Sequence, residues 1–162
     1  MFDKSIILGI DPGKSGGWAC YKFDGTVDVG IMPLSVDEVN VSELAIYLKN
    51  FQRLEKVLVV IEKVHSMPKQ GVASTFSFGT SYGKLLGMCQ TLGVSYELVI
   101  PQTWKKDILF GTDKDKNAAV AYVDRFWPSI ETVPQGCRKP HLGIVDAVCI
   151  MAWGVKKYVE KA

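Results

Sequence analysis

The sequence is poor in the residues that build zinc sites, disulfides and membrane spans. It has four cysteines and two histidines, and no two cysteines have CxxC spacing, which argues against a structural zinc site. Three of the cysteines lie in apolar contexts typical of reduced core residues, so we expect a cytoplasmic protein. No apolar run approaches the roughly 18 residues that span a bilayer. The first residues show no signal-peptide pattern, and we expect no membrane partner.

A strong charge of either sign is also lacking. The net charge is +2, which alone predicts no polyanionic partner, so the distribution of charge matters more than its sum. Apolar and charged residues make up 48% and 22% of the chain, as in ordinary globular proteins. A chain of 162 residues can bury a core without cross-links, and we expect one domain over residues 1–162.

Apolar patterns predict three strands followed by alternating helices and strands. We expect strands at residues 5–11, 16–23, 26–32, 57–61 and 95–100, and helices at 42–53, 74–92, from 101, from about 113 to 126, and 142–158. Ser42 is the expected cap of the first helix, and Thr112 or Asp113 that of the fourth. The continuous β-branched run at 57–61 predicts a strand covered on both faces. This order favours an α/β fold with a mixed sheet and helices on both faces.

Three glycines recur every four residues in the predicted helix at 74–92. Gly79, Gly83 and Gly87 share one face, and each costs about 1 kcal/mol in a helix interior. Close approach of another backbone would explain them. We favour tight packing within the subunit, with contact to a partner subunit as the alternative.

Three acidic residues stand out by position. Asp11 ends the first apolar strand, directly before a Pro-Gly turn, and Glu62 ends the run at 57–61. Asp146 lies among apolar neighbours in the first turns of the last helix. A buried carboxylate needs a partner for its charge. If the first and fourth strands are neighbours, Asp11 and Glu62 meet at one edge of the sheet, within reach of Asp146.

Such a group of carboxylates predicts a site for hard divalent cations. Three carboxylates cannot share a dry site unless their charge is neutralised, and Mg²⁺ prefers one or two carboxylates together with phosphate oxygens. Two ions about 3.5–4 Å apart can activate a water and stabilise the leaving oxygen in phosphodiester cleavage. For any one of these acids, a cap or surface role is an equal interpretation.

With these acids, the sequence resembles the RuvC family of Holliday junction resolvases, and most of all its bacteriophage members. The resemblance covers nearly the whole chain and rests on residues 7–13, 60–62, 81–87, 101–106, 115–116 and 145–147. It implies an RNase H-like fold with a mixed five-stranded sheet, a homodimer, and paired nicks across four-way and other branched DNA that leave 5′-phosphates. It also implies two Mg²⁺ or Mn²⁺ ions held by Asp11, Glu62 and Asp146, in a bacterial or phage-infected cytoplasm.

The chain departs from that family next to its final aspartate. The family usually carries a fourth acid three or four residues upstream, where this chain has Gly143 and Leu142. His141 is the nearest candidate for a metal ligand or general base, with a helix cap or a surface residue as the alternative. By resemblance, Lys116 matches a basic residue that lies close to the scissile phosphate, where it would stabilise transition-state charge.

Basic residues cluster in the predicted loops beside the acids. Such residues can neutralise DNA phosphates, although any single one is equally typical of a solvated surface. The predicted DNA-binding residues are Lys14, Lys63, His65, Lys69, Lys105, Lys106, Lys114, Arg138 and Lys139. The family also inserts a loop residue into the junction, for which Phe76, Met67 and His65 are the candidates.

Two other classes remain open. Sugar kinases and actin-like ATPases also begin with a strand, an aspartate and a glycine turn, but they need two such domains and a second phosphate loop. A branched-DNA-binding protein without nuclease activity would keep the fold. The acids Asp11, Glu62 and Asp146 argue against it, whereas the absent fourth acid favours it.

Overall fold

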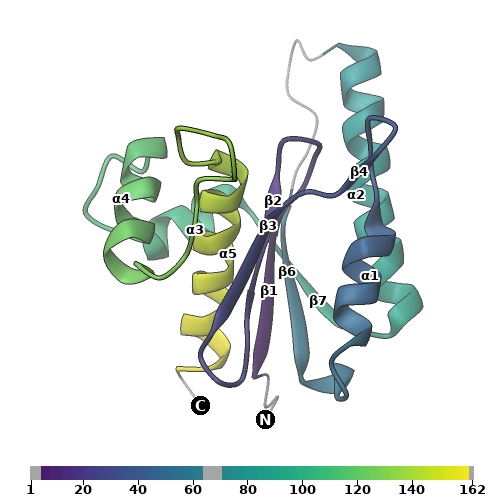
Figure 1. Ribbon diagram of the computed structural model, residues 1–162, viewed down its shortest axis with the longest axis horizontal. Coiled ribbons are helices and arrows are strands. Elements are labelled where there is room, and N and C mark those ends of the chain that lie inside the picture. The colour runs from purple at the N-terminus through teal and green to yellow at the C-terminus, as the bar shows by residue number, and fades with distance from the viewer. Residues whose placement is uncertain (1–4, 64–70, 161–162) are drawn as a thin grey trace.

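Five strands form one mixed sheet through the middle of the molecule (Figure 1). The computed structural model describes residues 5–63 and 71–160. The strand order is β3-β2-β1-β6-β7, with bounds Ile6–Asp11 for β1, Gly17–Tyr21 for β2, Val27–Ile31 for β3, Val57–Glu62 for β6 and Ser95–Val99 for β7. β1 pairs antiparallel with β2 and parallel with β6. The predicted α/β fold with a mixed five-stranded sheet is confirmed.

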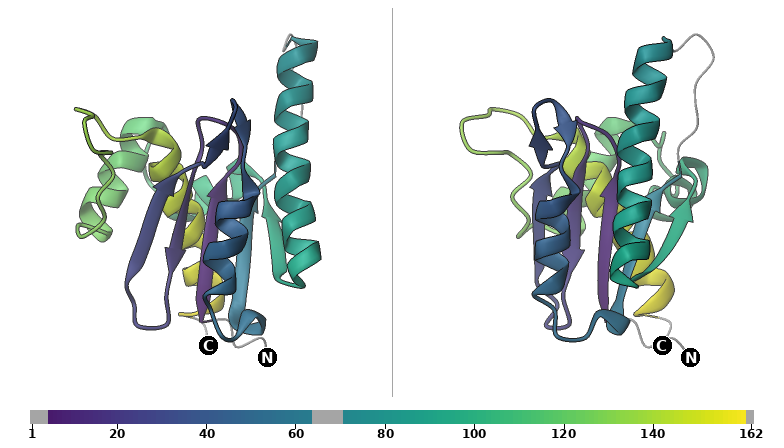
Figure 2. Two further views of the ribbon diagram at one scale, coloured as in Figure 1. Left: turned by 45° about the vertical axis from the view of Figure 1, so that its right-hand side comes forward. Right: turned by 90° about the vertical axis from the view of Figure 1, so that its right-hand side faces the viewer.

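Helices cover both faces of this sheet (Figures 1 and 2). One face carries α1 (Val41–Lys49) and α2 (Val72–Leu92), and the other carries α3 (Pro101–Ile108), α4 (Lys116–Phe126) and α5 (Leu142–Tyr158). A short hairpin of β4 (Leu34–Ser35) and β5 (Glu38–Val39) leads into α1, and the 3-10 turn η1 (Leu54–Lys56) leads into β6. The sequence pattern did not predict this hairpin.

The central strands are apolar on both sides because each side faces a separate core. Ile7 and Val60 belong to the core under α5, whereas Leu8 and Val59 belong to the core under α1 and α2. All four side chains are fully buried. The continuous apolar run at 57–61 thus forms a strand covered on both faces, as predicted.

The backbone of α5 lies directly on β1 and β2 because glycines remove the side chains between them. A Cβ atom at Gly9 would lie 2.4 Å from the Met151 nitrogen, and one at Gly154 would lie 2.6 Å from Cγ2 of Ile7. A Cβ at Gly17 would lie 2.8 Å from Gly143. These positions have no room for any side chain, and they fix α5 closely against the sheet.

Two predicted helix caps are wrong. Asn40 caps α1, and its Oδ1 accepts a hydrogen bond from the nitrogen of Ser42 at 3.1 Å, so Ser42 lies inside the helix. Asp115 caps α4 and accepts from the nitrogen of Ala118 at 2.8 Å. The predictions chose polar residues two or three positions away, because several neighbouring side chains could have made the same bond.

The glycine face of α2 is open. A Cβ atom added at Gly79, Gly83 or Gly87 would meet nothing within 4 Å. Packing of these glycines within the subunit is therefore a wrong prediction: α2 turns Leu85 and Cys89 toward the sheet and these glycines outward. Figure 2 also shows that α2 extends beyond the end of the sheet.

Among the described residues, no helix is long and apolar enough to cross a membrane. Three cysteines, Cys20, Cys89 and Cys149, are buried as free thiols, as their apolar contexts predict, and Cys137 is exposed.

Candidate active site

The parallel pairing of β1 and β6 brings two of the predicted acids to one edge of the sheet. Ile10 lies opposite Ile61 in the register, so Asp11 and Glu62 end their neighbouring strands side by side. Both are only half-buried, unlike the fully buried residues before them. The two buried strands thus end on carboxylates that lie next to each other at one edge of the sheet, as the sequence predicts.

Asp146 reaches the same edge from the second turn of α5. The contact that fixes it is backbone to backbone, since a Cβ at Gly9 would lie 2.6 Å from the oxygen of Ala147, the next residue. Asp146 is half-buried while its neighbours Val145 and Ala147 are fully buried. The helix therefore turns its one acidic side chain away from the core and toward the ends of β1 and β6.

Electrostatics show that the three acids form one group. Burial raises the pKa of Asp11 to about 8, and the charges of Glu62 and Asp146 contribute to that rise. Burial also raises the pKa of Glu62 and that of Asp146, and the charge of Asp146 adds to the rise at Glu62. Repulsion and desolvation of this kind favour binding of a cation between the carboxylates.

Two lysines oppose this repulsion. The positive charges of Lys105 and Lys116 each lower the pKa of all three acids, against the effect of burial. Lys105 lies in α3 and Lys116 is the first residue of α4. The structure therefore brings both lysines to the acid site, although their roles toward DNA stay predictions.

Trp104 is a site residue that sequence reasoning missed. Its Nε1–H donates a hydrogen bond to Oε1 of Glu62 at 3.1 Å, and the side chain is 1% exposed. The hydrogen bond lowers the pKa of Glu62 against the effect of burial. A signal was present: Trp104 lies in the first turn of the helix that follows β7, and β7 pairs in parallel with β6, so both strands end at the same edge.

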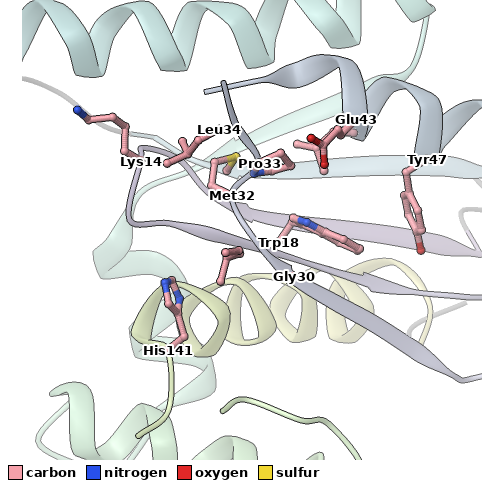
Figure 3. A pocket seen from close by; sticks show the side chains of 11 residues that line it. Lys14, Trp18, Gly30, Met32, Pro33, Leu34, Glu43, Tyr47 and His141 are labelled. Carbon is pink, nitrogen blue, oxygen red and sulfur yellow. The ribbon is translucent and has the colours of Figure 1, made fainter. Parts of the chain in front are cut away.

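His141 caps α5 and is not among the charges that act on the acids. Its Nδ1 accepts a hydrogen bond from the nitrogen of Ile144 at 3.3 Å. Its side chain lines a cavity of about 620 Å³ beside Trp18 and Tyr47, which none of the three acids lines (Figure 3). The structure thus supports the cap, the alternative named above, and a metal or general-base role stays a prediction.

The absent fourth acid has a steric explanation. A Cβ atom at Gly143 would lie 2.5 Å from both the oxygen of Ser15 and the carbonyl carbon of Gly16. Any side chain at this position would push α5 away from the turn that follows Asp11. Leu142, the other candidate position, is 39% exposed. In this chain the first turn of α5 packs against residues 15–16 so closely that Gly143 cannot be replaced by the acid that the resembled family carries there.

The remaining predicted DNA-binding residues differ in their exposure and contacts. Lys14 forms an ion pair with Asp37, with 2.7 Å between Nζ and Oδ2, and it also lines the cavity with His141. The exposed members of the set are Lys63, Lys106, Lys114, Arg138 and Lys139. His65, Lys69 and the wedge candidate Met67 lie outside the described residues. Phe76, the wedge candidate within the described residues, is 77% exposed on α2 and so does not belong to the core.

The chemistry of the three carboxylates suits Mg²⁺ or Mn²⁺. Carboxylate oxygens without a thiolate or imidazole match the preference of hard cations. Within residues 5–63 and 71–160, no three or more His, Cys, Asp or Glu side chains are arranged so that they could hold a metal ion by themselves. Mg²⁺ needs no such cluster, because it usually binds one or two carboxylates and completes its shell with water and phosphate oxygens.

Comparison with known proteins finds similar folds among solved structures. No protein-family model and no curated protein matches the chain. The solved structure of Thermus thermophilus RuvC in complex with a Holliday junction substrate superposes with a TM-score of 0.62 at 16% identity, covering 94% of this chain and 96% of that one. Another Thermus thermophilus RuvC structure has a TM-score of 0.53 at 18% identity, with the same coverage.

The chain therefore has an RNase H-like fold, and within that class the fold is RuvC-like. Both solved structures are of the Thermus thermophilus protein. The bacteriophage type that the motifs suggest accordingly stays a prediction.

Proposed function

We propose that the protein is a metal-dependent endonuclease that cuts branched DNA, and four-way junctions in particular, by paired nicks. The observation that carries the proposal is the meeting of Asp11, Glu62 and Asp146 from three separate elements at one edge of a RuvC-like fold. A structural role would not require three carboxylates to repel one another there. The solved relative that covers nearly the whole chain is itself in complex with a Holliday junction.

In this proposal, the three acids hold two Mg²⁺ or Mn²⁺ ions, and His141 is a further candidate ligand. Such ions, when bound, supply a nucleophilic water and stabilise the charge on the leaving oxygen. Lys105 and Lys116 lie beside the acids and would stabilise negative charge on the phosphoryl oxygens as it develops. The expected products carry 5′-phosphates and 3′-hydroxyls.

A hollow beside the turn that follows Asp11 offers a path for a DNA strand. A cavity of about 530 Å³ lies between the turn after Asp11 and α2, lined by Lys14 and by serines of both segments. Hydroxyl and ammonium groups of this kind bind phosphates without reading sequence. Phe76 is exposed in the second turn of α2, where it can stack on a base at the junction. Binding should therefore weaken steeply with salt.

The proposal includes a homodimer, because paired nicks need two acid sites. The open glycine face of α2 is the surface we assign to a second copy of the chain. Gly79 and Gly83 are exposed and meet nothing within 4 Å, and exposed Val72 and Phe76 precede them on the same helix. Gly83→Arg should convert a dimer to a monomer in light scattering, whereas Asp124→Arg, at an exposed position of α4 on the other face of the sheet, should not. Equal masses for the two variants would contradict this interface.

The test of function compares a synthetic four-way junction with a linear duplex of the same sequence. We expect symmetric nicks in the junction with Mg²⁺, none with EDTA, and little cleavage of the duplex. Junction binding without metal-dependent nicking would instead favour the inert binding protein. Cleavage of both DNAs at equal rates would show a nuclease without structure selectivity.

A further inference from the structure

Among the described residues, Glu62 is the acid of the site that accepts a side-chain hydrogen bond on one oxygen. The indole Nε1–H of Trp104 donates to Oε1 at 3.1 Å. An indole has one N–H and no acceptor, and an ionised carboxylate has about four lone-pair sites on its two oxygens, so this contact takes one lone pair of Oε1. The bond therefore makes the two oxygens of Glu62 unequal: the protein already holds Oε1, and Oε2 keeps more acceptor capacity for an ion.

The fold holds this donor in place. Trp104 is 1% exposed and packs in the core with Val99, Ile108 and α5 residues. Pro101 begins α3 directly after β7, and β7 is paired with β6 through the register of Glu62 and Val99. Both partners of the hydrogen bond thus sit on elements that are fixed to each other, and the indole cannot swing away without opening the core.

The consequence lies in how many oxygens Glu62 can offer to an ion. Ca²⁺ takes 6–8 oxygens at 2.3–2.6 Å and often binds a carboxylate through both oxygens, whereas Mg²⁺ demands octahedral geometry at 2.0–2.1 Å. A carboxylate with one oxygen engaged by a buried donor is suited to single-oxygen coordination. The contact thus disfavours Ca²⁺ more than it disfavours a small ion.

We propose that Trp104 is a positioning residue that makes the acid site selective for Mg²⁺ and Mn²⁺ over Ca²⁺, because its hydrogen bond to Oε1 favours coordination of an ion by Glu62 through Oε2 alone. The proposal rests on the metal site of the proposed function. It differs from a purely structural role for Trp104, which would affect all divalent ions equally.

The chain offers a matched control. Trp153 is 5% exposed and also donates its Nε1–H to a carboxylate, Oδ2 of Asp107, at 2.9 Å. That pair joins α5 to α3 and involves none of the three acids. Trp104→Phe and Trp153→Phe therefore remove the same kind of bond from the same core, and only the first removes it from the site.

The experiment measures dissociation constants of Mn²⁺ and Ca²⁺ without DNA, by electron paramagnetic resonance of free Mn²⁺ with Ca²⁺ as competitor. In Trp104→Phe, the ratio of the Ca²⁺ to the Mn²⁺ constant should fall about 10-fold, the lower end of the effect of removing a ligand's hydrogen-bond partner. Trp153→Phe should keep the wild-type ratio. Asp11→Asn should abolish the Mn²⁺ binding that is compared.

A wild-type ratio in Trp104→Phe would overturn the proposal, as would an equal fall in Trp153→Phe or Mn²⁺ binding that survives Asp11→Asn. If Trp104→Phe loses its circular dichroism spectrum, a benzothienyl analogue at position 104 replaces the N–H by sulfur at nearly the same volume, with the same expected fall. The two proposals fail separately. If the wild type does not nick junctions but Trp104→Phe shifts the ratio, only the proposed nuclease function is contradicted. If the wild type nicks junctions and the ratio is unchanged in Trp104→Phe, only the proposed metal selectivity is contradicted.

Discussion

Glycines on the two faces of the sheet serve opposite purposes. Under α5, a Cβ at Gly9 or Gly143 would lie within 2.6 Å of backbone atoms of another element. On α2, a Cβ at Gly79, Gly83 or Gly87 would meet nothing within 4 Å. The first group lets α5 rest on β1 and carries Asp146 to the acid site, and the second leaves a bare helix surface.

The difference shows that the spacing of glycines in the sequence does not tell which element, if any, packs against them. The regular spacing on α2 predicts close packing, yet the close packing occurs at Gly9, Gly17 and Gly143, which have no regular spacing. The closely packed face holds the proposed chemistry, and the open face is the one that we propose as the contact with a second copy. Replacing a glycine by a larger residue should therefore lower the free energy of unfolding on the closed face and raise it on the open face.

The largest effect is expected on the closed face, for Gly143→Glu. This change adds an acid where the resembled family carries one, but its Cβ would lie 2.5 Å from the Ser15 oxygen. We expect the free energy of unfolding in urea to fall by about 3 kcal/mol, at the upper end of overpacking effects. The matched Gly87→Glu on α2 should change it far less. If Gly143→Glu is as stable as the wild type and binds Mn²⁺ more tightly, the claim that this face has no room for a side chain is contradicted.

The next effect concerns the burial of Asp11 beneath α5. Its pKa of about 8 in the folded protein exceeds the unfolded value of 3.8, so losing the proton costs stability. In EDTA, the free energy of unfolding should therefore fall as the pH rises from about 4 to 8. Asp11→Asn should remove most of that fall and be more stable than the wild type at pH 8 by a few kcal/mol.

Urea titrations at pH 5 and pH 8 measure this effect. Asp124→Asn, an exposed residue of α4, should keep the fall seen in the wild type. Mg²⁺ should stabilise the wild type at pH 8 but not Asp11→Asn. Parallel pH profiles for the wild type and Asp11→Asn would contradict the electrostatic description of the site.

A smaller effect is expected at the start of α5. His141→Ala removes the acceptor for the Ile144 nitrogen and should cost about 1 kcal/mol, the usual effect of losing a cap. His141→Asn should restore stability, because asparagine caps well. If His141 also binds metal, the Mg²⁺ concentration for half-maximal nicking will rise in both variants. A wild-type Mg²⁺ requirement in both would remove His141 from the site.

The smallest effect is expected on the open face. Gly83→Ala has room for its methyl group and should stabilise the protein by up to about 1 kcal/mol through helix propensity. The measurement is urea unfolding at a concentration low enough to keep the chain monomeric. Destabilisation of the monomer would mean that α2 packs on this face within the subunit.

The sequence predicted the sheet and the acid site because both depend on local patterns. Apolar runs that end on Asp11 and Glu62 indicate strands and place both acids at one edge once the strands are parallel neighbours. The bond from Trp104 to Glu62 joins residues 42 positions apart, so its only signal in the sequence is that Trp104 follows a strand that pairs in parallel with the strand of Glu62. The roles of Gly143 and Gly83 depend on which element packs against them. The spacing of glycines in the sequence does not contain that information.

Cleavage of a four-way junction by Asp11→Asn tests the central claim most directly. Binding and nicking of one labelled junction would be measured in Mg²⁺ for the wild type, Asp11→Asn and Asp124→Asn. We predict that Asp11→Asn binds the junction as the wild type does and does not nick it, while Asp124→Asn does both. Normal nicking by Asp11→Asn would contradict the assignment of the acids as the active site.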